Sequence, residues 1–447
     1  MVSAGRIQAK RLAGSSAYDV LVSHNEPRAL LEYDQALDLI LERLDALKSE
    51  PVASKDAFGR TLRQDLQTDS DLPPFHRSTM DGFAICAETF RPETLYTVVG
   101  SIAAGGIWKS DKESVDQEIA ALGIATGAMV PPPFNAVIPR EQAEVHHTRQ
   151  VEQVRFTTES IEPWTNVHCQ GSDAKYGEKV LLAGTHLAAT HVGIATTVGA
   201  STIRVSRRPR VSLLTTGDEV RELDCRTLTR GQIRNSNGPM LECLINFWGG
   251  AVQRHRHVTD DPIPTLDAAS KVLYESDLVV TTGGVSAGKR DLLPRMWGEL
   301  GLETILHGVR IQPGKPLFVA SGPKNGSSKQ ASGSRARIIL GLPGNPVSAL
   351  VTAHLFLWPV LRSLLGMNPQ ELPWRSVRTT GEVKPGAHRQ LFRAARFVGE
   401  GRDMVELIPW HGSGDLVHTV SADGLVKLPL QEQIVPAGTI VPILEHL

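Results

Sequence analysis

The sequence predicts a multidomain protein of the α/β plus β class, in which a three-layer α/β domain is flanked by β-rich regions. Strands alternate with helices after Arg210, which is typical of a parallel sheet. Short β-branched runs broken by Gly and Pro come before Arg210, and short strands return after Pro373. We therefore expect an N-terminal helix and two interleaved β-rich domains at 1–207, the α/β domain at 208–366 and an all-β, barrel-like domain at 367–447.

The spacing of apolar residues locates individual elements. Asp34 can cap a helix and Pro51 lies beyond its end, and between them the apolar positions recur at helical spacing: Leu37, Ile40, Leu41, Leu44 and Leu47. In the α/β domain, apolar runs predict strands at 211–215, 278–281, 304–306, 317–319 and 338–340, and helices at 239–247 and 346–365.

Charge and composition exclude several classes of protein. The chain of 447 residues has 47 Lys and Arg against 48 Asp and Glu, so it offers no excess positive charge to nucleic acid or an anionic membrane. No apolar run approaches the ~18 residues that span a bilayer, and residues 1–16 lack the apolar core of a signal sequence, so we expect a cytoplasmic protein. The four scattered cysteines indicate buried thiols rather than disulfides or a zinc finger.

Four clusters of glycine and turn residues follow predicted strands of the α/β domain, at 215–219, 281–288, 313–316 and 341–346. Open parallel sheets bind ligands at the carboxyl ends of their strands, where Gly-Gly turns can direct several N–H groups at one anion. One such cluster alone is more often a plain turn, but together they predict a phosphate or oxyanion pocket. The candidate binding residues are Thr216, Gly217, Asp218, Gly283, Gly284, Ser286, Gly288, Pro313, Gly314 and Gly344.

Two more side chains are expected at this pocket. Asn345 can cap the helix that begins at Pro346, which would leave the positive end of that helix beside the same sheet edge. Lys315, close to two prolines that stiffen the chain, is the natural counter-charge, although a solvated surface lysine is an equally good interpretation.

Carboxylates form the other half of the predicted site. Glu219 follows the first strand, Asp291 follows the second glycine cluster, and Asp81 and Asp173 lie upstream. Carboxylates near a phosphate pocket usually hold Mg²⁺, which prefers oxygen ligands. Taken singly, each could instead cap a helix or lie in a solvated loop.

Residues 321–337 are rich in Gly, Ser and Lys and have almost nothing apolar to bury. They predict a disordered surface loop. The alternative is a basic patch for an acidic partner.

Six segments, in order along most of the chain, resemble the molybdopterin molybdenumtransferase family, whose members include bacterial MoeA and the E domain of gephyrin. They are 73–85 (PPFHRSTMDGFAI), 124–131 (IATGAMVP), 208–220 (RPRVSLLTTGDEV), 281–293 (TTGGVSAGKRDLL), 312–317 (QPGKPL) and 341–350 (GLPGNPVSAL). The resemblance implies an enzyme of the final step of molybdenum cofactor synthesis. Such an enzyme inserts molybdate into adenylylated molybdopterin, uses a divalent cation such as Mg²⁺ and releases AMP.

The same resemblance implies roles for single residues. Those with catalytic roles are Asp81, Thr126, Asp173, Glu219 and Asp291, of which Glu219 and Asp291 would bind the cation; Lys315, Ser348 and Arg389 are oxyanion-site candidates. The resemblance also implies a homodimer whose pocket is shared between the α/β domain of one subunit and the β-rich domains of the other. Molybdopterin adenylyltransferase and molybdoenzyme maturation proteins are the expected protein partners.

The chain departs from the family pattern near the expected pocket. Asn235 and Lys289 stand where acidic residues are usual, and Gln312 stands where Lys is common. Either the cation binds more weakly, or Arg234 and Lys289 neutralise phosphate themselves. These departures motivate an alternative, a molybdopterin carrier or scaffold with little catalysis. A molybdopterin adenylyltransferase is a second alternative, which the β-rich domains at both ends disfavour.

Overall fold

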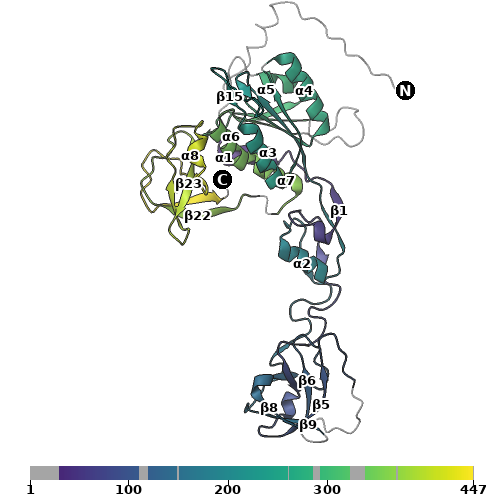
Figure 1. Ribbon diagram of the computed structural model, residues 1–447. Coiled ribbons are helices and arrows are strands. Elements are labelled where there is room, and N and C mark those ends of the chain that lie inside the picture. The colour runs from purple at the N-terminus through teal and green to yellow at the C-terminus, as the bar shows by residue number, and fades with distance from the viewer. Residues whose placement is uncertain are drawn as a thin grey trace, which may run out of the picture. The chain divides into compact units, whose positions relative to one another are not determined.

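The computed structural model describes residues 30–109, 119–147, 151–259, 261–284, 292–322, 338–368, 371–445 and 447. The chain divides into two compact units, which we describe separately (Figure 1). The larger unit comprises residues up to Asp45, Arg208–Leu364 and Glu371–Leu447. The smaller unit comprises Ala46–Arg207 and Leu365–Gln370.

A six-stranded sheet is the centre of the larger unit, with the strand order β16-β13-β17-β21-β20-β18. The first four strands are parallel, and β20 and β18 run antiparallel to their neighbours. The central strands are almost wholly buried, as expected for a parallel sheet covered on both faces. The strands are β13 (Arg210–Thr216), β16 (Ala251–Val258), β17 (Leu278–Thr282), β18 (Glu303–His307), β20 (Phe318–Ser321) and β21 (Ile338–Leu342).

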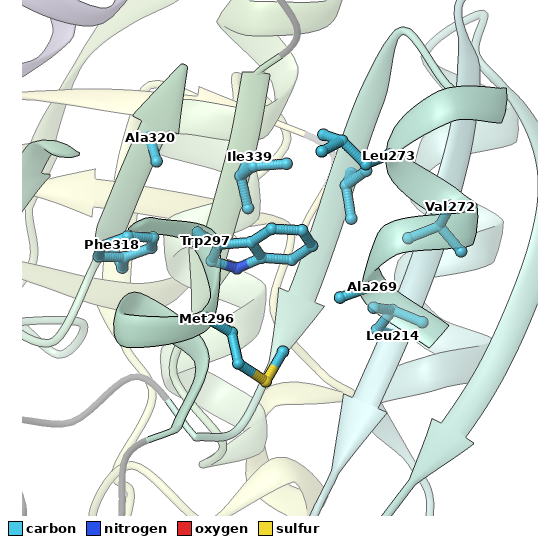
Figure 2. Packing of buried hydrophobic residues seen from close by; sticks show 10 residues of the cluster. Leu214, Ala269, Val272, Leu273, Met296, Trp297, Phe318, Ala320 and Ile339 are labelled. Atoms are coloured by element: carbon cyan, nitrogen blue, oxygen red, sulfur yellow. The ribbon is translucent and has the colours of Figure 1, made fainter. Parts of the chain in front are cut away.

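Helices cover both faces of this sheet, which confirms the three-layer prediction (Figure 1). The helices α4 (Pro262–Glu275) and α5 (Leu292–Glu299) pack on one face, where Trp297 is fully buried close to Ile339 and Phe318 (Figure 2). Truncating a buried aromatic of this size costs about 3–5 kcal/mol. Trp297 is therefore a major contributor to the stability of the α/β domain.

The opposite face is covered by α3 (Asn237–Phe247) and by a long helical segment. That segment consists of α6 (Pro346–Thr352), a π-helical turn (Ala353–Leu357) and α7 (Trp358–Leu365). By length and composition it could cross a membrane, but 89% of its apolar window is buried inside the protein. Its apolar character is thus explained by its place in the core.

The C-terminal region forms a closed five-stranded barrel, as the barrel-like prediction required. The ring runs β23-β24-β22-β26-β25 and closes through pairing of β25 with β23. The short strand β19 joins it by parallel pairing of Ile311 with Gln390. The elements are β19 (Ile311–Gln312), β22 (Trp374–Thr379), β23 (Gln390–Val398), β24 (Met404–Leu407), α8 (Leu416–Thr419), β25 (Gly424–Lys427) and β26 (Ile440–Glu445).

The first helix, α1, spans Tyr33–Leu41, so it begins before the predicted cap at Asp34 and ends before Leu44 and Leu47, which were predicted to belong to it. A capping box between Glu32 and Gln35 starts the helix, and Asp34 lies in its first turn instead of capping it. The chain then leaves the larger unit after Asp45.

The smaller unit contains two β-rich parts, as predicted. A six-stranded sheet has the order β7-β4-β6-β5-β9-β8. It is inserted in sequence between the paired segments of the second part, in which β1 pairs with β12 and β2 with β11. The elements are β1 (Ser49–Ala53), β2 (Leu66–Gln67), β3 (Arg77–Ser78), β4 (Gly82–Ile85), β5 (Tyr96–Ile102), β6 (Ala120–Ile124), β7 (Ala136–Pro139), β8 (Ala143–His147), β9 (Glu152–Phe156), β10 (Val167–His168), β11 (Lys179–Leu181), α2 (Ala189–Thr197) and β12 (Thr202–Ser206).

Candidate active site

A pocket of about 800 Å³ lies at the carboxyl ends of β13, β17 and β21 in the larger unit. The chain runs from β13 to the edge strand β16 and then returns past β13 to β17, so the direction of winding reverses between β13 and β17. In open α/β sheets, ligands bind at such a switch point. All four glycine clusters contribute lining residues to this pocket.

Gly283 is the point at which three of those clusters meet. Its φ is +87°, and a Cβ there would lie 2.6 Å from Thr216 Oγ1 and 2.8 Å from the Thr216 carbonyl oxygen. A Cβ on Gly344 would lie 3.5 Å from Gly283 Cα. The loops can approach this closely only because glycine has no side chain. The glycines at positions 283 and 344 therefore determine how closely the loops pack beneath the pocket.

Asn237, at the start of α3, links two of the loops. Its Nδ2 donates to Thr282 Oγ1 at 2.9 Å and to the Gly344 carbonyl at 2.7 Å. Its Oδ1 is buried and accepts no hydrogen bond from the described residues, and Thr216 Oγ1 is in the same situation. An unmet buried polar atom costs about 1–3 kcal/mol. Asn237 therefore ties the two loops together through its Nδ2 alone.

The charge of the pocket is mainly positive. Among the described residues that line it, the cationic side chains are Arg234, Lys315 and Arg389, and the anionic one is Glu219. Arg389 comes from the C-terminal barrel, next to the β19–β23 pairing. The pocket thus suits a ligand that carries several negative charges.

The barrel contributes further lining residues that sequence reasoning missed, namely Trp410, Gly412 and Ser413. Ser413 is fixed by Asn345, whose Nδ2 donates to Ser413 Oγ at 2.8 Å, and by the Val347 amide, which donates to its carbonyl at 3.0 Å. Asn345 does occupy the N-cap position of α6, but its side chain makes no cap hydrogen bond, so the expected side-chain capping was wrong. In the sequence, only the turn pattern Gly412-Ser413-Gly414 could have indicated these lining residues.

Asn235 supports the pocket wall from a buried position. Its Nδ2 donates to Glu222 Oε1 at 2.8 Å and to Thr215 Oγ1 at 3.0 Å, while its Oδ1 accepts from the Gly238 amide at 3.0 Å. Both ends of the amide are therefore used. A carboxylate at this position would lose the two donated bonds.

Of the other predicted residues, Ser348 is buried and lines the pocket, together with Thr216, Gly217, Gly284, Pro313 and Gly314. Asp218 is exposed and is not among the lining residues. Ser286, Gly288, Lys289 and Asp291 lie outside the described residues.

In the smaller unit, Asp81 and Thr126 lie side by side. The Thr126 amide donates to Asp81 Oδ1 at 2.8 Å, and both residues are exposed. Asp81 lies just before β4 and Thr126 lies just after β6. These two strands are hydrogen-bonded neighbours in the sheet, and Gly82 pairs with Ile124, which brings the two residues together. Two of the predicted catalytic residues are therefore brought together although they are 45 positions apart.

Asp173 belongs to a second polar group in the smaller unit. His168 Nε2 lies 2.7 Å from Asp173 Oδ1, and His168 Nδ1 lies 2.9 Å from Arg77 Nη2. Because a guanidinium can only donate, Nδ1 must accept and Nε2 must carry the proton that bonds Asp173. The imidazole thus bridges Arg77 and Asp173.

The fold and pocket define a multidomain protein of the enzyme-like class, whose pocket at an α/β switch point suits an anionic ligand. A family model described as "MoeA N-terminal region (domain I and II)" matches residues 31–199, and one described as "Probable molybdopterin binding domain" matches residues 212–363. A Synechococcus elongatus protein named molybdopterin molybdenumtransferase is 32% identical over 425 residues, which cover 93% of this chain and 99% of that protein. A Staphylococcus epidermidis protein of the same name is 28% identical over 427 residues, or 94% and 96% of the two chains. The chain belongs to the molybdopterin molybdenumtransferase family, which confirms the resemblance carried by the six segments.

Solved structures agree on the fold. A crystal structure of the molybdopterin biosynthesis moeA protein from Pyrococcus horikoshii has a TM-score of 0.76 at 24% identity and covers 94% of this chain and 100% of that one. A second crystal structure of that protein has a TM-score of 0.72 at 27% identity, with 93% and 99% covered. The chain is accordingly a transferase of molybdenum cofactor biosynthesis, in which it serves the molybdenum insertion step.

Proposed function

We propose that the protein inserts molybdate into adenylylated molybdopterin and releases AMP. The observation that carries this proposal is the pocket at the switch point, with three cationic side chains and one carboxylate among its described lining residues. Adenylylated molybdopterin contains a phosphoanhydride and molybdate is a dianion. Both need fixed donors and positive charge where negative charge develops.

The lining residues offer a division of roles. Lys315 and Arg389 supply positive charge for phosphate and molybdate oxygens, and Ser348 and Ser413 supply hydroxyl donors. The turn at Gly283 and Gly284 leaves room for the ligand to approach the backbone closely.

We propose that a divalent cation such as Mg²⁺ acts with the substrate. Mg²⁺ is usually held by one or two carboxylates together with substrate phosphates, so the lining carboxylate of Glu219 fits this ion. Asp291 is the proposed second ligand. When bound, the cation would neutralise charge that develops on the phosphoanhydride oxygens.

Asp81, Thr126 and Asp173 are proposed to complete the pocket across a homodimer. Their side chains are exposed in the smaller unit, and the hydrogen bond to His168 holds Asp173 at a defined position. A shared pocket requires a dimer, which light scattering at micromolar concentration would detect; a monomer would contradict the shared site. Cytoplasmic location, with molybdopterin adenylyltransferase upstream and molybdoenzyme maturation proteins downstream, is part of the same proposal.

The test is an assay of the purified protein with adenylylated molybdopterin and Mg²⁺, with and without molybdate. We expect AMP release and a product that activates a cofactor-free molybdoenzyme only when molybdate is present. Tight binding without AMP release would instead support the carrier, and consumption of ATP with molybdopterin would support an adenylyltransferase. Lys384→Ala, which alters an exposed lysine of the barrel that does not line the pocket, serves as the control for pocket variants.

A further inference from the structure

Three potential metal ligands converge in the loop that follows β24 and the short helix α8 at its end. They are His411, Asp415 and His418, whose ligand atoms all lie within 4.8 Å of one another. His411 Nδ1 is 3.2 Å from Asp415 Oδ2, and His418 Nδ1 is 2.7 Å from the same oxygen. Within the described part of the chain, this is the one group of at least three His, Cys, Asp or Glu residues with that convergence.

The carboxylate at the centre is fixed before any ligand binds. Asp415 accepts from the His411 amide at 2.8 Å and from the His418 amide at 3.4 Å, and its side chain is 12% exposed. The hydrogen bond from the His418 side chain, followed by that from the His411 amide, lowers the pKa of Asp415 well below its ordinary value. Hydrogen bonds from two backbone amides and from His418 therefore orient the carboxylate of Asp415.

Each imidazole directs a ring nitrogen at Asp415, and a metal that bound there would displace the proton of that nitrogen. In both histidines Nδ1 is directed at Asp415, and the two rings meet edge to face with centroids 5.2 Å apart. Tetrahedral ligands at ordinary zinc distances lie about 3.4 Å from each other, so small outward shifts would admit an ion. The His411 side chain is 82% exposed and the His418 side chain 46%, which leaves both free to make such shifts.

We propose that His411, Asp415 and His418 form a binding site for a divalent transition metal of the zinc class. Two imidazoles and one carboxylate favour such ions over Mg²⁺ or Ca²⁺, which prefer oxygen ligands, and the remaining coordination positions would hold water. The site is separate from the cation of the proposed reaction, and it does not depend on the proposed function.

The proposed metal site lies in the same segment of the chain as two residues that line the pocket. Ser413 lies midway between His411 and Asp415, and both Gly412 and Ser413 line the pocket. An ion that joins residues 411, 415 and 418 would restrain the loop that carries Ser413. Metal occupancy should thus reduce the mobility of one wall of the pocket.

The test is a Zn²⁺ titration of tag-free, chelator-treated full-length protein by calorimetry, with bound metal counted by mass spectrometry. We expect one site in the micromolar range or tighter, and the double variant His411→Ala/His418→Ala should lose that site with at least roughly a 100-fold fall in affinity. The matched control is His146→Ala/His147→Ala, which removes two exposed, adjacent histidines of β8 whose side chains point to opposite faces of the strand. It should bind as the unaltered protein does.

Two results would overturn the proposal: no Zn²⁺ bound to the unaltered protein, or equal binding by the double variant. Because His418 and Asp415 also pair with each other, thermal unfolding without metal checks that the double variant folds. If it does not, the single variant His411→Ala, at the most exposed ligand, replaces it. Binding by that single variant equal to the unaltered protein would also refute the three-ligand site.

Discussion

The side-chain amide of Asn235 donates a hydrogen bond of 2.8 Å to the carboxylate of Glu222. Family members are expected to carry an acidic residue at position 235, where this chain has an amide between Glu222 and Thr215. The amide is thus matched to its neighbours in this chain. An acid at this position would face another carboxylate.

We predict that Asn235→Asp destabilises the larger unit instead of simply strengthening a cation site. Asn235 is 7% exposed, so its replacement would leave two carboxylates close together with little water between them. We expect a loss of about 2–4 kcal/mol in the free energy of unfolding, measured by denaturant titration. Adding Glu222→Gln should restore most of it, because the amide introduced at position 222 can donate to the carboxylate introduced at position 235. Equal stability of the single variant and the unaltered protein would contradict this prediction.

Gly283→Ala should damage both stability and ligand binding. The new methyl would meet two Thr216 oxygens at 2.6 and 2.8 Å, at a φ of +87° that non-glycine residues rarely adopt. We expect about 1–3 kcal/mol of destabilisation, seen as a lower thermal midpoint. Gly298→Ala is the matched control, because it lies in α5 with open space around its Cβ and should leave stability unchanged or raise it slightly.

Lys315→Ala should weaken binding of the anionic substrate. A charged donor to phosphate or molybdate contributes about 1.5–3 kcal/mol, which corresponds to roughly a 10- to 100-fold rise in Kd. Lys315→Arg should retain part of the affinity because the charge remains. Ligand-fluorescence titrations of both variants beside Lys384→Ala would decide the point. A Kd unchanged in Lys315→Ala would return Lys315 to the solvated-surface interpretation.

Tyr33→Phe should change how stability responds to alkaline pH. Burial, with a smaller effect of Asp34, raises the pKa of Tyr33 above its ordinary value. The folded protein therefore holds this proton more tightly than the unfolded chain, so the contribution is complete below about pH 10 and is lost as the pH rises further. Phenylalanine cannot ionise, so the variant should lose less stability between about pH 9 and pH 11. Tyr176→Phe, at a side chain that is 75% exposed, should follow the unaltered protein.

Much of the fold was predictable because the buried parallel strands are nearly continuous apolar runs. The same reasoning placed the glycine clusters at one sheet edge, and Gly283 and Thr216 do meet there. The hydrogen bond from Asn345 to Ser413 was not predictable, because it joins residues 68 positions apart through tertiary packing. The pairing of Asn235 with Glu222 was hidden for the same reason. Local pattern could not reveal partners that only the folded chain selects.

The two-residue strand β19 has a consequence for how the protein could be divided. Its pairing with β23 ties the loop of Lys315 to the barrel strand that begins beside Arg389. An excised α/β domain ending near residue 366 would keep the glycine loops but lose Arg389, Trp410 and Ser413. Replacing the barrel of this protein by that of a relative would accordingly replace part of the pocket wall. The anion preference of such a chimaera should depend on both proteins from which it was made.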